Sequence, residues 1–332
     1  MISDIGAAAE LVILDVGHGN AAVLHERHTT VVVDTGCRSH LLEYLTKRKI
    51  TSIDLVILSH SDQDHIAGLI GILGAEICVK LVLVNSDPDK ASAIWRDLVF
   101  ALEDARRRGE VGFEVGLSSR QLTCSGLGRC KMEVSGPTPE LAALGVGALD
   151  RQGRKITSNS ISACIRVMFD DRPVALLAGD VDDVALCTML EADQDLKASI
   201  LVFPHHGGLP GKVTPGDFAQ RLLTAVAPTT VIFSVGRGKH NNPRPEVVGA
   251  AIGQRKEMNV VCTQLSVSCS EQAIAAGVSP PSAVFSAGAA AGICCAGSIC
   301  IDLQTSSIVA PNLVAHQAFV DMKVPTPLCR TS

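Results

Sequence analysis

The sequence predicts an α/β fold organised around one stretch, residues 55–73. An apolar, β-branched run at 55–58 is typical of a buried strand, and residues 66–73 resume an apolar pattern that suits a helix. The turn between them carries four side chains that can ligate a metal: His60, Asp62, Asp64 and His65. In α/β folds, ligands collect at the carboxyl ends of strands, so we expect the functional site on this turn.

The rest of the chain alternates between β-branched runs and segments with helical spacing. Further helices are expected at 39–49, 91–108 and 246–257. Further strands are expected at 10–16, 21–24, 29–33, 77–84, 163–169, 174–177, 199–203, 230–235 and 260–262. With 332 residues, of which 47% are hydrophobic, the chain can bury a sizeable core.

The polar groups at the strand ends favour a divalent metal. Carboxylates and imidazoles packed within six residues repel one another or stay unpaired unless a cation lies among them. The alternative is a solvated polar turn, because Ser-Asp-Gln-Asp is ordinary turn composition. Later strands supply more ligands, since Asp180 follows 174–177, and His205 and His206 follow 199–203.

These motifs resemble a known family. His60-Ser61-Asp62-Gln63-Asp64-His65 resembles the His-x-His-x-Asp-His signature of the metallo-β-lactamase superfamily, with Asp62 in place of the second His. Together with Leu-Asp-Val-Gly-His-Gly-Asn at 14–20, this variant resembles the hydrolase domain of ComEC-type DNA-uptake competence proteins. The family usually has Gln and Asp where His18 and Asn20 stand. The other matching motifs are Asp34-Thr35-Gly36, Gly179-Asp180 and His205-His206-Gly207.

The resemblance implies an αββα four-layer sandwich at 1–265, with two mixed sheets and the site at one edge. We expect residues 266–332 to form a Cys-, Ala- and Gly-rich appendage packed on the same domain. The resemblance also implies two divalent ions, and the carboxylates make Mn²⁺ competitive with Zn²⁺. The first ion would take His60, Asp62 and Asp180. The second would take Asp64, His65, Asp180 and one of His205 and His206, with His206 favoured by its place before Gly207.

Several other residues are expected around the ions. Asp34 would orient the His60 loop. Asn159 and Ser160 stand where β-lactamases carry a third-motif histidine, and no histidine occurs between His65 and His205. They would bind phosphate or orient a water. The loop after 230–235 would face phosphate through Arg237, Lys239, Asn242 and Arg244, and His240 would protonate the leaving oxygen. The alternative is an exposed basic loop with no ligand.

Composition limits the class of function. Aromatic residues make up 3%, which argues against a protein that stacks single strands on rings, and the net charge of −5 is not that of a basic nucleic-acid coat. The 12 cysteines, and acidic rather than basic residues at 1–10, predict a cytoplasmic protein without a membrane span. The tail cysteines favour buried thiols, and the alternative is a structural Zn²⁺.

The expected function is phosphodiester hydrolysis. The leading hypothesis is a nuclease that cleaves DNA with a hydroxide held between two metal ions, acting in antiviral defence or against other foreign DNA. The alternatives are a cyclic-nucleotide phosphodiesterase, a hydrolase of lactones, thioesters or β-lactams, and a catalytically silent metal-binding module with a protein partner. A homodimer is a further expectation.

Overall fold

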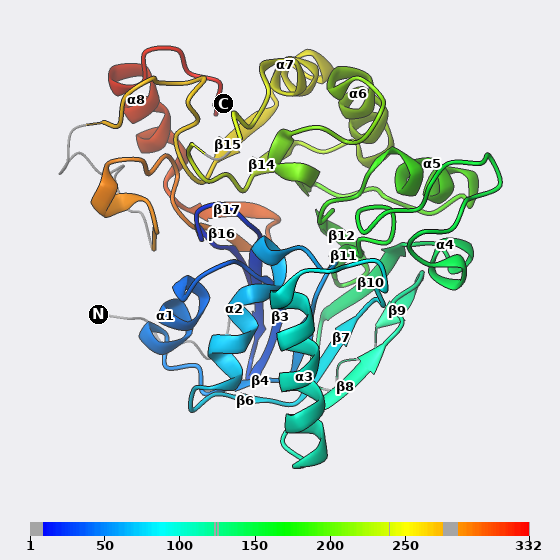
Figure 1. Ribbon diagram of the computed structural model, residues 1–332. Coiled ribbons are helices and arrows are strands. Elements are labelled where there is room, and N and C mark those ends of the chain that lie inside the picture. The colour runs from blue at the N-terminus through cyan, green and yellow to red at the C-terminus, as the bar shows by residue number, and fades with distance from the viewer. Residues whose placement is uncertain (1–8, 123, 125, 239, 275–284, 332) are drawn as a thin grey trace.

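The computed structural model describes residues 9–122, 124, 126–238, 240–274 and 285–331, and it contains two large mixed sheets (Figure 1). The first, in spatial order, is β17 (Ser307–Ala310), β16 (Ile299–Asp302), β1 (Glu10–Ile13), β2 (Ala21–Glu26), β3 (Thr29–Thr35), β5 (Leu55–Ile57), β7 (Leu81–Val84) and β8 (Gly112–Val115). The second is β15 (Asn259–Cys262), β14 (Thr230–Phe233), β13 (Ile200–Val202), β12 (Arg172–Leu177), β11 (Cys164–Phe169), β10 (Cys130–Gly136) and β9 (Arg120–Leu122). A small sheet pairs β4 (Ser52–Ile53) with β6 (Cys78–Val79).

The alternation of side chains along the strands separates three apolar cores. In β5, Leu55 and Ile57 enter a core shared with the second sheet, whereas Val56 enters a core on the opposite face. In β13, Ile200 and Val202 enter the same shared core, and Leu201 points the other way. Because successive side chains of a strand point to opposite faces, both faces of each sheet are buried. The two sheets therefore pack face to face as the inner layers of a sandwich.

Helices form the two outer layers. The face of the first sheet opposite the shared core is covered by α1 (His40–Lys47), α2 (Gln63–Leu73) and α3 (Ala93–Arg107). The corresponding face of the second sheet packs against α4 (Pro139–Leu144), α5 (Asp183–Glu191), α6 (Pro215–Val226), α7 (Pro245–Gln254) and α8 (Leu313–Lys323). Figure 1 shows α1, α2 and α3 grouped apart from α5, α6 and α7. The predicted αββα sandwich is confirmed.

The expected strand at 77–84 is two strands in the structure. Lys80 separates β6, which belongs to the small sheet, from β7, which continues the first sheet. The two-residue strands β4 and β6 run parallel, and each lies just before a longer strand of the first sheet. An apolar, β-branched run alone does not show which partner each part of it will take.

The C-terminal segment completes the first sheet. Strand β16 pairs antiparallel with β1, and β17 pairs with β16. Cys295 and Phe319 join the core beneath the second sheet, and an isolated bridge joins Val260 to Arg330. We propose that residues 266–332 are an appendage of the single domain that residues 1–265 form.

Within the part of the chain that the structure describes, every helix is too short or too polar to cross a lipid bilayer. The short helices η1 (Pro204–Gly207) and η2 (Ala289–Ala291) complete the elements named here.

Candidate metal centre

The polar residues that follow separate strands meet at one edge of the sandwich. After β5 the chain turns through His60 into α2, whose first turn carries Asp64 and His65. Asp180 follows β12, and the η1 turn with His205 and His206 follows β13, which is the parallel neighbour of β12. Parallel neighbours end at the same edge of a sheet, which explains how residues far apart in sequence come together.

One group of possible metal ligands consists of His60, His65 and Asp180, whose ligand atoms all lie within 4.8 Å of one another. The Nε2 atom of His65 is 3.5 Å from Asp180 Oδ1, and that of His60 is 3.9 Å from Asp180 Oδ2. All three residues are buried. The Asp180 carboxylate therefore faces both imidazoles.

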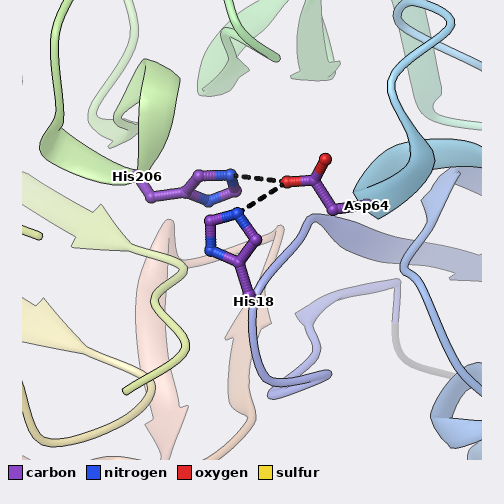
Figure 2. A group of neighbouring side chains, drawn as sticks. All are labelled: His18, Asp64 and His206. Carbon is purple, nitrogen blue, oxygen red and sulfur yellow. Dashed lines mark ion pairs between the residues drawn. The ribbon is translucent and has the colours of Figure 1, made fainter. Parts of the chain in front are cut away.

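A second group consists of His18, Asp64 and His206, within the same 4.8 Å limit (Figure 2). Both imidazoles approach the Asp64 carboxylate. The groups adjoin, because Asp64 Oδ2 lies 4.0 Å from His65 Nε2. The sequence predicts Asp64 and His206 as ligands but leaves the role of His18 undecided.

The residues fit divalent cations. The Nε2 atoms of His60, His65, His205 and His206 are buried, and none has a hydrogen-bond partner among the described residues. A buried polar atom without a partner costs about 1–3 kcal/mol, and a metal ion supplies the missing interaction for imidazole nitrogens. The His and Asp groups could therefore bind metal, because imidazole nitrogens and carboxylate oxygens are common metal ligands.

In the ion-free chain, the carboxylates around His65 favour its imidazolium form. Burial opposes ionisation of Asp180, but the charges of His65 and His205 hold its pKa well below the ordinary value. Burial likewise opposes protonation of His65, but Asp34 and Asp180 raise its pKa well above the ordinary value. Asp64 is also partly desolvated, and its contacts with His18 and His206 lower its pKa. The carboxylates thus favour positive charge at this point.

Asp34 fixes the orientation of His65. The Nδ1–H of His65 donates to Asp34 Oδ2 at 2.7 Å, which leaves Nε2 directed at Asp180. The same carboxylate accepts from the Ser59 backbone N–H at 2.7 Å and from the Ser59 hydroxyl at 2.8 Å. Asp34 therefore holds both the loop before His60 and one imidazole of the group.

We expect Asp34→Asn to weaken metal binding while the fold is kept. Asn retains an acceptor and tolerates the left-handed conformation of Asp34, whose φ is 59°, but it removes the charge that stabilises His65. The loss of such an orienting partner typically costs roughly 10–100-fold in metal affinity. Calorimetric titration of the ion-free protein would measure this. Asp54→Asn is the control, because Asp54 accepts from the Thr30 N–H and pairs with Lys80 outside the two metal-binding groups. Equal affinity for wild type and Asp34→Asn would contradict the assigned role.

Asp62 and His205 border the first group without belonging to it. Asp62 Oδ2 is 3.7 Å from His60 Nε2, and its other oxygen forms an ion pair with Lys90. His205 Nδ1 is 3.6 Å from Asp180 Oδ2, and the His205 backbone N–H donates to Asp180 Oδ1 at 3.1 Å. His205 and His206 therefore face different carboxylates, since His206 approaches Asp64.

The turn that carries these two histidines is left-handed at both positions. His205 has φ of 52° and His206 has φ of 54°, a region that residues other than glycine rarely adopt. Asn242 supports the turn by donating from its side-chain amide to the His205 carbonyl at 3.1 Å. Such backbone conformations persist only where surrounding structure imposes them, and they cluster at functional sites.

Part of the loop that was predicted to bind phosphate instead holds the neighbouring backbone. The Arg237 guanidinium donates to the carbonyl oxygens of Leu265, Ser266, Ser270 and Glu271, so its donors are occupied by backbone. Arg244 is half-buried and lies 3.7 Å from a Glu246 carboxylate oxygen. His240 is exposed, and its ring centroid is 5.0 Å from that of His18. Lys239 lies outside the described residues.

The stretch around Asn159 contacts the candidate metal centre through Ser162, whereas Ser160 bonds elsewhere. The Ser160 hydroxyl donates to Asp182 Oδ2 at 2.6 Å, which ties this stretch to the start of α5. Ser162 instead accepts from the Asp180 N–H at 3.0 Å, and its oxygen is 3.5 Å from His60 Nδ1. The Asn159 amide oxygen is buried and has no hydrogen-bond partner within the described part of the chain.

A cleft of about 460 Å³ opens beside the second group. Asp64 and His18 form part of its wall, and Arg38, His40 and Gln63 also line it. Ala287 and Ile293 of the C-terminal segment also line it. The cleft is in the size range of ligand pockets, which is roughly 300–1,000 Å³.

The tail cysteines lie apart from both groups. Cys295 Sγ is 3.9 Å from Cys329 Sγ and 3.4 Å from His316 Nε2, and all three residues are buried. Neither of the possible metal-binding groups found among the described residues contains a cysteine. The structural Zn²⁺ of the tail stays a prediction.

The sequence from the end of strand β1 to Asp180 decides the family. Residues 14–180 match the metallo-beta-lactamase superfamily. The chain belongs to this superfamily. The superfamily contains metal-dependent hydrolases, and the His and Asp groups described above suit an enzyme of that class.

Relatives within the superfamily are distant. The chain is 21% identical over 286 residues to ComE operon protein 3 of Bacillus subtilis (strain 168), which covers 78% of this chain and 32% of that protein. It is 33% identical over 87 residues to hydroxyacylglutathione hydrolase of Saccharophagus degradans, which covers 24% of this chain and 30% of that protein. The chain spans about a third of the length of these relatives.

Solved structures of the superfamily are similar at 13% identity. The metal-dependent hydrolase Tm1679 matches with a TM-score of 0.47, covering 76% of this chain and 95% of that one. YhfI from Bacillus subtilis matches with a TM-score of 0.44, covering 73% of this chain and 93% of that one. The short form of human tRNase Z matches with a TM-score of 0.38, covering 67% of this chain and 91% of that one.

Three residues near the candidate metal centre have no role that the sequence predicts. His18 gave a signal, since an imidazole stands in a Gly-His-Gly turn where the superfamily resemblance has Gln. Ser162 lies within the stretch already singled out, just before β11. Lys90 gave no local signal, because its contact with Asp62 joins segments 28 residues apart.

Proposed function

We propose that this chain is a metal-dependent phosphodiesterase that cleaves DNA. The observation that carries the proposal is the pair of adjoining ligand groups, which share a boundary at Asp64 and His65. Two neighbouring divalent ions suit displacement at phosphorus, because they lower the pKa of a water molecule and neutralise charge on the phosphoryl group. In this proposal His60, Asp62, His65 and Asp180 hold one ion, and Asp64 and His206 hold the other.

The donor set supports phosphoryl rather than acyl chemistry. Three carboxylates, Asp62, Asp64 and Asp180, stand among the imidazoles, and oxygen donors favour harder ions such as Mn²⁺. No histidine occurs between His65 and His205, where the resemblance would place a third-motif imidazole. Carboxylate ligands of this kind bind Mg²⁺ or Mn²⁺ together with substrate phosphates.

The residues around the cleft can bind and protonate a phosphodiester. The chain is acidic overall, with a net charge of −5, so attraction of a polyanion depends on local cations. Arg38 is exposed and lines the cleft beside Asp64, which suits a contact to phosphate. His240 lies beside His18, where its imidazole can donate a proton to the leaving oxygen. Asn159 is a further phosphate contact in this proposal.

A second candidate is thioester hydrolysis. It is favoured by the 33% identity over 87 residues to hydroxyacylglutathione hydrolase. A metal centre also polarises a carbonyl oxygen, so the ligand groups alone permit this reaction. The substrate therefore has to be decided by assay.

The deciding experiment is a substrate screen of the purified chain with Mn²⁺ and with Zn²⁺. The substrates are plasmid DNA, single-stranded DNA, RNA, a cyclic dinucleotide and a glutathione thioester. We expect cleavage of DNA that stops when the ions are chelated and returns when Mn²⁺ is added. Thioester hydrolysis with intact DNA would overturn the proposal in favour of the second candidate. Cleavage of the cyclic dinucleotide alone would restrict the substrate to a small nucleotide.

The Asp62 carboxylate makes a specific prediction about the metal. We expect a higher rate with Mn²⁺ than with Zn²⁺ in the wild type, and a shift toward Zn²⁺ in Asp62→His, because imidazole suits Zn²⁺ and carboxylate suits Mn²⁺. The ratio of the two rates is the measurement. Asp89→His is the matched control, since Asp89 is exposed and pairs with Lys155. An unchanged ratio in Asp62→His would show that Asp62 does not set the preference.

A further inference from the structure

His18 reaches the centre from a part of the chain far from the other ligands. It lies on the loop between β1 and β2, whereas Asp64 begins α2 and His206 follows β13. Figure 2 shows the imidazoles of His18 and His206 pointing at one Asp64 carboxylate. Their Nε2 atoms are 3.0 Å and 3.4 Å from the same oxygen, Oδ2.

These separations are those of ligands on a common ion. With metal–ligand bonds of about 2.1 Å, neighbouring ligand atoms lie roughly 3.0–3.4 Å apart in octahedral or tetrahedral geometry. An N–H···O hydrogen bond is about 2.7–3.2 Å long, so the 3.0 Å separation of His18 suits either arrangement, whereas the 3.4 Å separation of His206 exceeds a hydrogen bond. His206 is 4% exposed, and its Nε2 has no hydrogen-bond partner among the described residues, so a direct bond to Asp64 does not account for its position.

Contacts with the backbone hold the His206 imidazole and the loop that carries His18. The His206 Nδ1–H donates to the Ser234 carbonyl at 2.7 Å, which leaves the lone pair on Nε2 facing Asp64. The Ser234 hydroxyl donates to the Gly19 carbonyl at 2.8 Å, next to His18. A Cβ at Gly19 would lie 2.2 Å from the Asp64 carbonyl oxygen, so only glycine permits this approach of the loop to α2. The position of His18 is therefore built into the fold.

We propose that His18 is a ligand of the ion held by Asp64 and His206. It supplies an imidazole from the β1–β2 loop to a chain that has no histidine between His65 and His205. The inference rests on the proposed metal-dependent function and adds one residue to its ligand set. Because His18 also lines the cleft, the ion fixes part of the substrate-binding wall.

The test measures metal binding rather than hydrolysis. Ion-free wild type, His18→Gln and His206→Gln are titrated with Co²⁺, and bound metal and the visible absorption bands are recorded. We expect His18→Gln to lose about 100-fold or more in affinity for one ion, beyond the range of about 10–100-fold for residues that only orient a ligand. We also expect its absorption bands to change as they do in His206→Gln. His40→Gln is the control, since His40 lines the same cleft outside both groups.

A second variant separates a ligand from a structural residue. In His18→Ala, free imidazole added to the buffer should restore the lost affinity and the original absorption bands. Unchanged affinity and bands in His18→Gln, with clear losses in His206→Gln, would overturn the proposal and leave His18 as an ion-pair partner of Asp64. If the wild type bound no Co²⁺, the proposed metal-dependent function itself would fail.

Discussion

Asp64→Asn should abolish hydrolysis and leave the chain folded. Asp64 Oδ2 is within 4.0 Å of Nε2 atoms from three histidines, so this carboxylate lies where the two groups of ligands meet. The amide keeps the size of the side chain but removes the negative charge that attracts a cation. A metal ion contributes several kcal/mol to a phosphoryl transition state, which corresponds to a loss of roughly 1,000-fold or more in kcat.

The measurement for Asp64→Asn is the single-turnover rate on the substrate identified by the screen, with circular dichroism as the test of folding. The carboxamide is compatible with the helix because Asp64 lies in the first turn of α2, after the N-cap residue Asp62. Asp97→Asn is the matched control, since Asp97 is an exposed acid near the start of α3. A folded Asp64→Asn enzyme with full activity would show that this carboxylate has no part in the reaction.

Metal removal should give the other large effect, a loss of thermal stability. Without ions, the buried carboxylate of Asp180 and the imidazoles around it must balance their charges with protons alone. An ion present at about 1,000 times its dissociation constant stabilises the folded chain by roughly 4 kcal/mol. At roughly 2–4 °C for each kcal/mol, this predicts an increase in Tm of about 10 °C per ion.

The Tm is followed by differential scanning calorimetry of the chelated protein before and after addition of Mn²⁺, together with elemental analysis. We expect a stoichiometry of two ions per chain and a smaller increase in Tm for Asp180→Asn. One ion per chain would remove the two-ion mechanism. A stoichiometry of zero, with the same Tm in chelator and in Mn²⁺, would remove metal binding altogether.

The strand ends that form the centre could be predicted because their signals are local. The run 55–57 is β-branched and apolar, and the residues after it change at once to ligand types. Buried parallel strands commonly have such continuous apolar runs, and the turn that follows cannot be buried without satisfying its polar groups. The same reasoning placed Asp180 and the His205–His206 turn.

Features that depend on long-range packing could not be predicted. Strand β16 pairs with β1, yet its four residues, Ile-Cys-Ile-Asp, carry no information about a partner nearly the whole chain away. The charge of Arg237 suggested phosphate, but four carbonyl oxygens of residues 265–271 occupy its guanidinium. The approach of His18 to Asp64 depends on how Gly19 packs against α2, which is a property of the assembled loop.

At the left-handed turn of His205 and His206, a substitution that lowers the backbone strain removes a metal-binding side chain. This conflict matters for directed evolution of the chain. Each non-glycine residue in this region costs about 1–3 kcal/mol, and glycine adopts it freely. A selection for survival at high temperature, carried out without metal, will therefore favour glycine at these two positions. Both substitutions delete an imidazole that faces a carboxylate of the centre. Libraries built on this chain should keep positions 205 and 206 fixed, or every round of selection should include metal uptake.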